Sequence, residues 1–142
     1  MREQGCLMER ITGIGGFFFR SVDPEKLNAW YEKHFGISQC AAEYEGGSWW
    51  QDEGPTVFGA IKSDQFGVSE NPWYLNFRVR DLDAMVAQLR GVGIEVKVEK
   101  DPYPNGRFAQ LRDPEGTLIE LWEPAGADLE RPMDNKASNH RA

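Results

Sequence analysis

The order of predicted strands and helices repeats once along the chain, and this repeat restricts the fold more than any other feature. The first half reads as a strand, a helix and three short strands: "ITGIGGFFFR", "DPEKLNAWYEKHFG", "ISQCAAEY", "SWWQ" and "TVFGAIK". The second half repeats that order with "WYLNFRVR", "DLDAMVAQLRGVG", "IEVKVEK", "RFAQLR" and "TLIELWE". A repeated β-α-β-β-β unit predicts an α+β protein built from two similar modules.

The repeat divides the chain into five segments. We predict a flexible leader at 1–9, a first module at 10–62, a linker at 63–72, a second module at 73–124 and a disordered tail at 125–142. The linker is polar and the tail has no apolar period, which is why neither is assigned to a module. With 142 residues, the chain is too short for two independent domains but long enough for two modules that share a core.

Both predicted helices have residues typical of helix ends. Asp23, followed by Pro24, and Asp81 are predicted N-caps, while Gly36 and Gly93 come just after the last helical residues. The apolar stripes are Leu27, Trp30 and Tyr31 in the first helix, and Leu82, Met85, Val86 and Leu89 in the second. We expect these stripes to pack on the sheets.

Composition argues against several classes of partner. Asp and Glu number 23 against 16 Lys and Arg, and no basic run occurs, so we expect no nucleic-acid partner. The longest apolar-looking stretch is short and contains several glycines, so we expect no membrane partner. The two cysteines, Cys6 and Cys40, form no disulfide framework, which is typical of a reducing, cytoplasmic location.

Strand side chains alternate between two faces, and one face of each predicted strand is suited to pack on the helices. The opposite faces combine aromatic, amide and charged residues: Phe18, Arg20, Tyr74, Asn76, Arg78, Leu118, Glu120 and Trp122. These faces either line a ligand pocket shared by the two modules or are exposed to solvent, as one side of an antiparallel sheet often is.

Glu120 lies inside an apolar strand, between Ile119 and Leu121. A buried carboxylate costs several kcal/mol unless it has a partner or gives up its charge. Glu120 therefore needs a metal ion, a cationic partner, a proton or a cavity to face.

The stretches "FFRSVDPEKLNAWYEKHFG" and "RDPEGTLIELWEP" resemble the vicinal oxygen chelate superfamily. That superfamily contains glyoxalase I, extradiol dioxygenases, fosfomycin-resistance transferases and bleomycin-resistance binding proteins, and the resemblance covers Ile11 to Pro124. It implies that curved mixed sheets from the two modules form an open barrel around a cavity, with the helices outside. It also implies a homodimer. The resemblance is specific for the fold and weak for the reaction, because the fold hosts both enzymes and binders.

Metal-dependent members hold a divalent ion at four positions, which the resemblance transfers to Gly16, Gly59, Tyr74 and Glu120. A catalytic ion needs about three protein ligands, and only Glu120 supplies one. We therefore expect no metal site and no cofactor. Glu120 is then either a functional carboxylate in a metal-free cavity or an ion-pair partner of Arg20 or Arg78. Glyoxalase I has an arginine at the position of Arg20 that contacts a carboxylate of glutathione.

These expectations lead to a glyoxalase-like protein that binds a small molecule between the modules without a metal. The ligand is expected to be an anionic or aromatic metabolite or antibiotic held by Phe18, Arg20, Tyr74, Asn76, Arg78 and Trp122. If the protein is an enzyme, Glu120 is the candidate general base. The alternative is a lactoylglutathione lyase-type enzyme or another metal-dependent isomerase or dioxygenase with relocated ligands. A third hypothesis is a subunit of an assembly whose cavity is vestigial.

Overall fold

The computed structural model describes residues 8–38, 47–62 and 71–131. Three predicted segments therefore lie partly outside the described residues: the leader 1–9, the linker 63–72 and the tail 125–142. The same holds for most of the predicted strand at 37–44. In the described part of the tail, Gly126–Leu129 forms a short 3-10 helix, η2, where the sequence predicted no regular structure.

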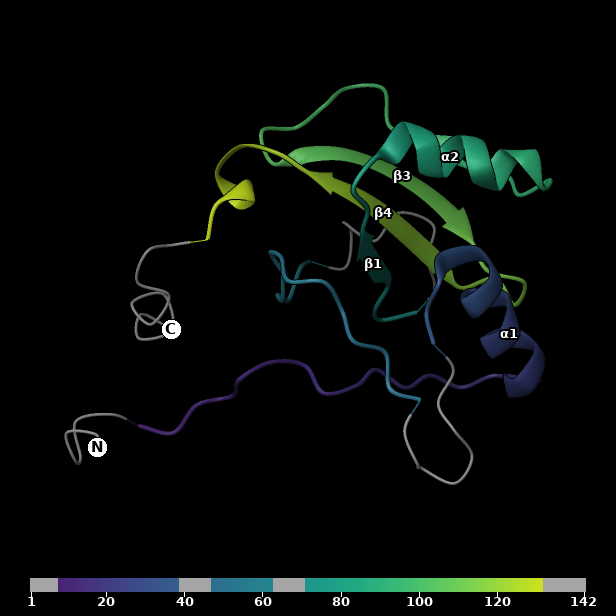
Figure 1. The fold of residues 1–142 in the computed structure, drawn as a ribbon, viewed down its shortest axis with the longest axis horizontal. Coiled ribbons are helices and arrows are strands. Elements are labelled where there is room, and N and C mark those ends of the chain that lie inside the picture. Colours follow the sequence, from purple (N-terminus) through teal and green to yellow (C-terminus); the bar gives the residue numbers. More distant parts are fainter. Residues whose placement is uncertain (1–7, 39–46, 63–70, 132–142) are drawn as a thin grey trace.

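The second half of the chain forms a mixed four-stranded sheet (Figure 1). Its strands are β1 (Leu75–Arg78), β2 (Lys97–Val98), β3 (Gly106–Arg112) and β4 (Leu118–Pro124), in the order β1-β4-β3-β2. Strand β1 is parallel to β4, and the other two pairings are antiparallel. The predicted α+β class and mixed sheet are confirmed, and β4, the strand that carries Glu120, lies inside the sheet.

Two helices begin and end where their sequence signals predict. In α1 (Pro24–Phe35), the Asp23 carboxylate accepts a hydrogen bond from the Lys26 backbone N–H, and Gly36 ends the helix in the left-handed region at φ 72°. In α2 (Leu82–Gly91), Asp81 accepts from the Ala84 N–H. Among the described residues, no helix has the length and apolar character needed to cross a bilayer.

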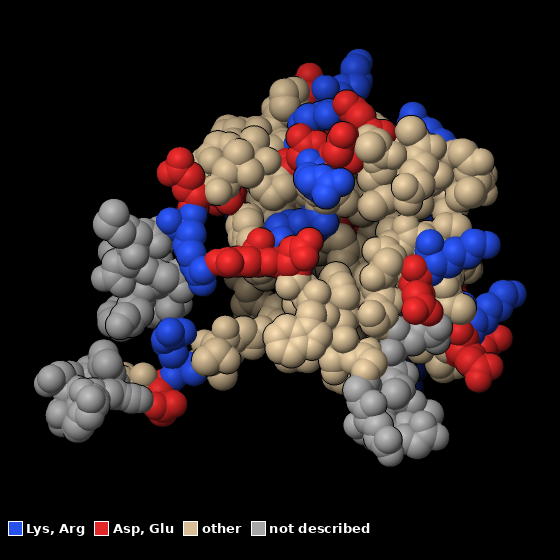
Figure 2. Space-filling view, in the orientation of Figure 1, with Lys and Arg blue, Asp and Glu red and all other residues tan. Residues whose placement is uncertain are grey.

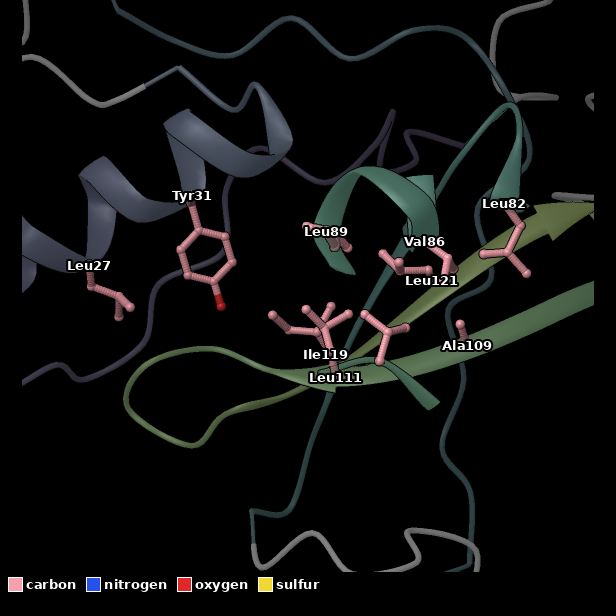
Figure 3. Close-up of a cluster of buried hydrophobic side chains, with 10 residues drawn as sticks. Leu27, Tyr31, Leu82, Val86, Leu89, Ala109, Leu111, Ile119 and Leu121 are labelled. Atoms are coloured by element: carbon pink, nitrogen blue, oxygen red, sulfur yellow. The ribbon is translucent and has the colours of Figure 1, made fainter. Parts of the chain in front are cut away.

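Both helices cover the same face of the sheet, and their apolar stripes form the core with it (Figure 3). Leu27 and Tyr31 of α1 are buried, as are Leu82, Val86 and Leu89 of α2. Their partners on the sheet include Ala109, Leu111, Ile119 and Leu121. The predicted stripes are therefore confirmed as the source of the core, and the opposite face of the sheet is left for other contacts.

The described residues of the first half contain no strand, and this corrects the expectation for three of the predicted strands there. Segments 11–20, 48–51 and 56–62 contain no strand, and residues 8–23 run as an extended chain (Figure 1). The four-stranded sheet does not close within the described residues, so the predicted open barrel is not confirmed. An alternating pattern selects a face but provides no backbone partner, and the three glycines Gly13, Gly15 and Gly16 make ordering more costly.

Two neighbouring side chains of segment 11–20 still point to opposite sides, although the segment forms no strand. Phe19 packs against the core and its ring lies 6.0 Å from that of Tyr31, whereas the neighbouring Phe18 is 91% exposed. The predicted division between the helix-facing and the opposite face is therefore correct at these two residues.

Candidate functional site

On the sheet face opposite the helices, the strand register determines which side chains are neighbours. Asn76 on β1 and Gln110 on β3 both lie directly beside Glu120 on β4. The next row pairs Trp122 with Arg78 on one side and with Phe108 on the other. Neighbouring strands lie about 4.8 Å apart, so side chains in one row contact each other. This register brings together Asn76, Glu120, Arg78 and Trp122 of the predicted site.

Glu120 is hydrogen-bonded to the amides on both sides. The Asn76 Nδ2 donates to Glu120 Oε1 at 2.7 Å, and the Gln110 side chain also donates to this carboxylate. Burial raises the pKa of Glu120, the negative charge of Glu99 adds to this rise, and the two amide hydrogen bonds oppose it. Burial also raises the pKa of Tyr74, with a further contribution from the charge of Glu120. We call Asn76, Glu120 and Gln110 the amide–carboxyl row.

The expected ion pair between Glu120 and Arg20 or Arg78 is not formed. Arg78 instead donates through Nη2 to the carbonyl oxygen of Asp52 at 3.2 Å. Its guanidinium also lies against Gly54, where an added Cβ would come within 2.3 Å of Nη1. The Arg78 guanidinium therefore contacts segment 52–54. The groups that hydrogen-bond Glu120 are the side-chain amides of Asn76 and Gln110.

The ion pairs among the described residues lie at the surface. They join Arg107 to Asp83 at 2.9 Å and Arg131 to Glu53. On the face shown in Figure 2, basic and acidic side chains are interspersed. Pairs this exposed contribute little stability, so neither the fold nor the site depends on them.

Trp122 is 2% exposed, and its contacts are with the protein itself. The indole Nε1 donates to the Asn105 carbonyl oxygen at 2.8 Å, and the ring lies nearly parallel to that of Phe108, at an interplanar angle of 4°. A ligand on this face would meet Phe108 before the Trp122 indole, because Phe108 is only half-buried.

A pocket of roughly 460 Å³ lies between the first half of the chain and the second. It is lined by Phe18, Phe19, Arg20, Asn71, Trp73, Glu115 and Thr117. We call it the inter-module pocket. It contains Phe18 and Arg20 of the predicted site, but the other predicted residues, Tyr74, Asn76, Arg78, Glu120 and Trp122, are not part of its lining. The structure thus divides the predicted site into this pocket and the amide–carboxyl row.

The turn "DPEG" at 113–116 joins the two halves beside this pocket. Asp113 is 4% exposed and accepts a hydrogen bond from the Tyr31 hydroxyl of α1 at 2.7 Å. Asp113 Oδ1 also accepts from the backbone N–H groups of Glu115 and Thr117. Burial raises the pKa of Tyr31, and its hydrogen bond to Asp113 raises it further, so the phenol stays protonated and acts as the donor.

Glu115 completes the junction at the N-terminus of α1. Its carboxylate accepts from the Ser21 hydroxyl at 2.8 Å and from the backbone N–H groups of Val22 and Asp23. Desolvation alone would raise the pKa of Glu115, but these hydrogen bonds together hold it below its usual range. The predicted site residues did not include Glu115 or Trp73, although Glu115 lies in the stretch "RDPEGTLIELWEP" that carries the family resemblance.

The four positions that the resemblance assigns to a metal ion do not fit one. Gly16 and Gly59 offer no side chain, and the Phe18 ring comes within 3.0 Å of where a Gly16 Cβ would lie. The Tyr74 phenol has a raised pKa, which disfavours the phenolate that binds metals. Glu120 is engaged by two amides. In the part of the chain that the structure describes, no group of three or more His, Cys, Asp or Glu side chains is arranged to hold an ion.

Comparison with known proteins identifies the family of the chain. A family model described as "Glyoxalase/Bleomycin resistance protein/Dioxygenase superfamily" matches residues 13–121. The chain is 30% identical over 105 residues to "Putative glyoxylase CFP32" of Mycobacterium bovis and, equally, to the protein of that name from Mycobacterium tuberculosis. This alignment covers 72% of the chain but only 40% of each relative.

The solved structures add a match in fold. TnmS3, an antibiotic binding protein from Streptomyces sp. CB03234, superimposes with a TM-score of 0.54 at 21% identity. The match covers 83% of this chain and 100% of TnmS3. At that identity the similarity establishes the fold.

Proposed function

Since the chain belongs to the Glyoxalase/Bleomycin resistance protein/Dioxygenase superfamily, we propose that it binds a small aromatic anion between its two halves without a metal ion. The fold alone does not select a function, because one fold hosts many. The proposal therefore rests on the chemistry of the inter-module pocket.

The observation that carries the proposal is the pairing of Arg20 with aromatic side chains in a pocket of roughly 460 Å³. That volume is within the range of about 300–1,000 Å³ typical of small-molecule sites. Phe17 and Phe19 both contact the Trp73 ring edge-on, at 5.1 and 6.1 Å between centroids, so the aromatic wall is held in place. A guanidinium recognises a carboxylate or phosphate through two parallel hydrogen bonds.

TnmS3 is an antibiotic binding protein by its description, and an antibiotic with an acidic aromatic group is one ligand of the proposed class. The relatives named glyoxylase are longer than the region that this chain matches. The sequence suggested Glu120 as general base, but a general base must lie within hydrogen-bond reach of the proton that it removes. Glu120 is not part of the pocket lining, so the proposal assigns it no role in turning over a molecule bound in this pocket. A cytoplasmic location stays a proposal based on cysteine usage.

Calorimetric titration with benzoate tests the proposal. We expect the wild type to bind benzoate and Arg20→Met to bind it at least about tenfold more weakly, because a charge-assisted hydrogen bond contributes roughly 1.5–3 kcal/mol. Arg10→Met is the matched control, since Arg10 is also an exposed arginine of the first half. Absence of binding at millimolar benzoate, or equal affinity in the wild type and Arg20→Met, would contradict the proposal.

We also propose that the protein forms a homodimer. Large apolar side chains are exposed along the strand-free segments of the first half, namely Ile11, Ile14, Phe18, Trp50, Val57 and Phe58. Patches of this kind mark association surfaces, and a second copy could supply the backbone partners that the segments lack.

Light scattering tests the dimer. We expect a particle of twice the 16.1 kDa chain mass at micromolar concentration, and Phe58→Ser should shift the population towards the monomer. Val92→Ser is the control, because Val92 is exposed at the end of α2, away from these segments. A particle of single-chain mass throughout the micromolar range would refute the proposal.

A further inference from the structure

The amide–carboxyl row presents hydrogen-bond acceptors that the proposed anionic ligand cannot use. An ionised carboxylate offers about four acceptor sites on its two oxygens. The side chains of Asn76 and Gln110 donate to Glu120 and so occupy about two of these sites. The remaining sites suit a group with two N–H donors. Each neighbouring amide also keeps its own carbonyl oxygen, which is a further acceptor.

The charges near this row favour a cation. Glu99 is close enough for its negative charge to act on Glu120, and Arg78 is directed at the Asp52 carbonyl. Lys97 lies in register with Gln110 on the edge strand β2, one strand further from Glu120. A carboxylate that is partly desolvated and hydrogen-bonded only by neutral amides gains most from a positively charged donor.

An aromatic surface lies in the adjacent row. Phe108 is half-buried, and its ring stands 5.7 Å from that of Tyr103, which is 53% exposed. A planar cation held by Glu120 would therefore have aromatic side chains for its apolar part.

We propose that the amide–carboxyl row is a second binding position, which takes a planar cation of the amidinium or guanidinium class through two N–H···O bonds to Glu120. This position deepens the proposed small-molecule function and rests on it, but it involves different residues from the inter-module pocket.

Thermal-shift and calorimetric titrations with benzamidine test this second position. The expected result is a rise of several degrees in melting temperature at saturating benzamidine and a loss of affinity of at least about tenfold in Glu120→Gln, which keeps the size and removes the charge. Glu130→Gln, the same substitution at an exposed residue, should bind like the wild type. Arg20→Met should also keep its affinity for benzamidine.

A neutral probe makes the test independent of how well the Glu120 variant folds. Benzamide has the shape of benzamidine without its charge, and we expect the wild type to bind it at least about tenfold more weakly. Equal affinity for the two probes, no binding of benzamidine at millimolar concentration, or unchanged affinity in folded Glu120→Gln would overturn the second position. Benzoate binding that depends on Arg20 would leave the proposed function intact in each of these cases, so the two failures are distinguishable.

Discussion

Replacing Asp113 with alanine is expected to lower the free energy of unfolding by about 3–5 kcal/mol, because three donors lose one buried acceptor. Asp113 is 4% exposed and accepts from the Tyr31 hydroxyl and from the backbone N–H groups of Glu115 and Thr117. The same substitution would release the turn from α1. Chemical denaturation monitored by circular dichroism gives the measurement.

Asp101→Ala is a matched control for this prediction, because Asp101 also precedes a proline but is exposed. Its effect should stay within about 0.5 kcal/mol. Tyr31→Phe isolates the hydrogen bond between the halves and should cost about 1–2 kcal/mol. If Asp113→Ala were no more destabilising than Asp101→Ala, the turn would not hold the two halves together as we describe.

Gly106→Ala is expected to destabilise the protein by about 2–4 kcal/mol, because both the backbone conformation and the available space exclude a side chain. Gly106 begins β3 at φ 137°, and an added Cβ would lie 2.1 Å from the Glu123 carbonyl oxygen. It would also lie 2.8 Å from the Trp122 Nε1. Strands β3 and β4 would have to separate where Gly106 pairs with Pro124.

Gly116→Ala is the control that separates the cost of a positive φ from the cost of steric overlap. Gly116 also has a positive φ, 88°, but nothing lies within 4 Å of its added Cβ. Its cost should be about 1 kcal/mol, clearly less than that of Gly106→Ala when both are measured by urea denaturation. Equal losses would mean that the close approach of β4 to Gly106 does not determine the stability there.

Local sequence signals predicted the elements of the second half because each signal acts within a few residues. Asp81 caps α2 through a hydrogen bond to a backbone N–H three residues later. Leu82, Val86 and Leu89 are buried because the helical period places them on one side. The dipeptide Asn105-Gly106 is a typical hairpin-turn signal, and Tyr103 and Gly106 exchange backbone hydrogen bonds there.

The strands predicted at 11–20, 48–51 and 56–62 are absent, because a strand depends on a distant backbone partner that local sequence signals do not reveal. Strand alternation places Phe18 on the face opposite the helices and so turns its neighbour Phe19 towards the core, where Phe19 packs. It carries no information on which backbone would pair with this segment. Long-range pairing of this kind has to offset the cost of closing a loop before it stabilises the chain.

Part of the candidate site follows from local alternation, which decides the sheet face on which a strand side chain lies, whereas the contacts that a side chain makes there depend on distant residues. Glu120 and Asn76 were assigned to one face, and they are adjacent there. The sequence suggested an arginine beside Glu120, whereas the Asp52 carbonyl, 26 residues from Arg78 in the chain, accepts the hydrogen bond of that arginine. Arg20 instead lines the inter-module pocket, as does Glu115 of the "DPEG" turn.

The central claim, that an aromatic anion binds in the inter-module pocket, is tested most directly by two-dimensional 1H–15N NMR of the full chain during titration with benzoate. The indole N–H of Trp73 and the side-chain Nε–H of Arg20 line or adjoin the pocket, and we predict saturable shifts of both signals. The indole of Trp50, which is 90% exposed and is not part of the pocket lining, should not shift. Saturable shifts elsewhere with unchanged Trp73 and Arg20 signals, or no shifts at millimolar benzoate, would contradict the account.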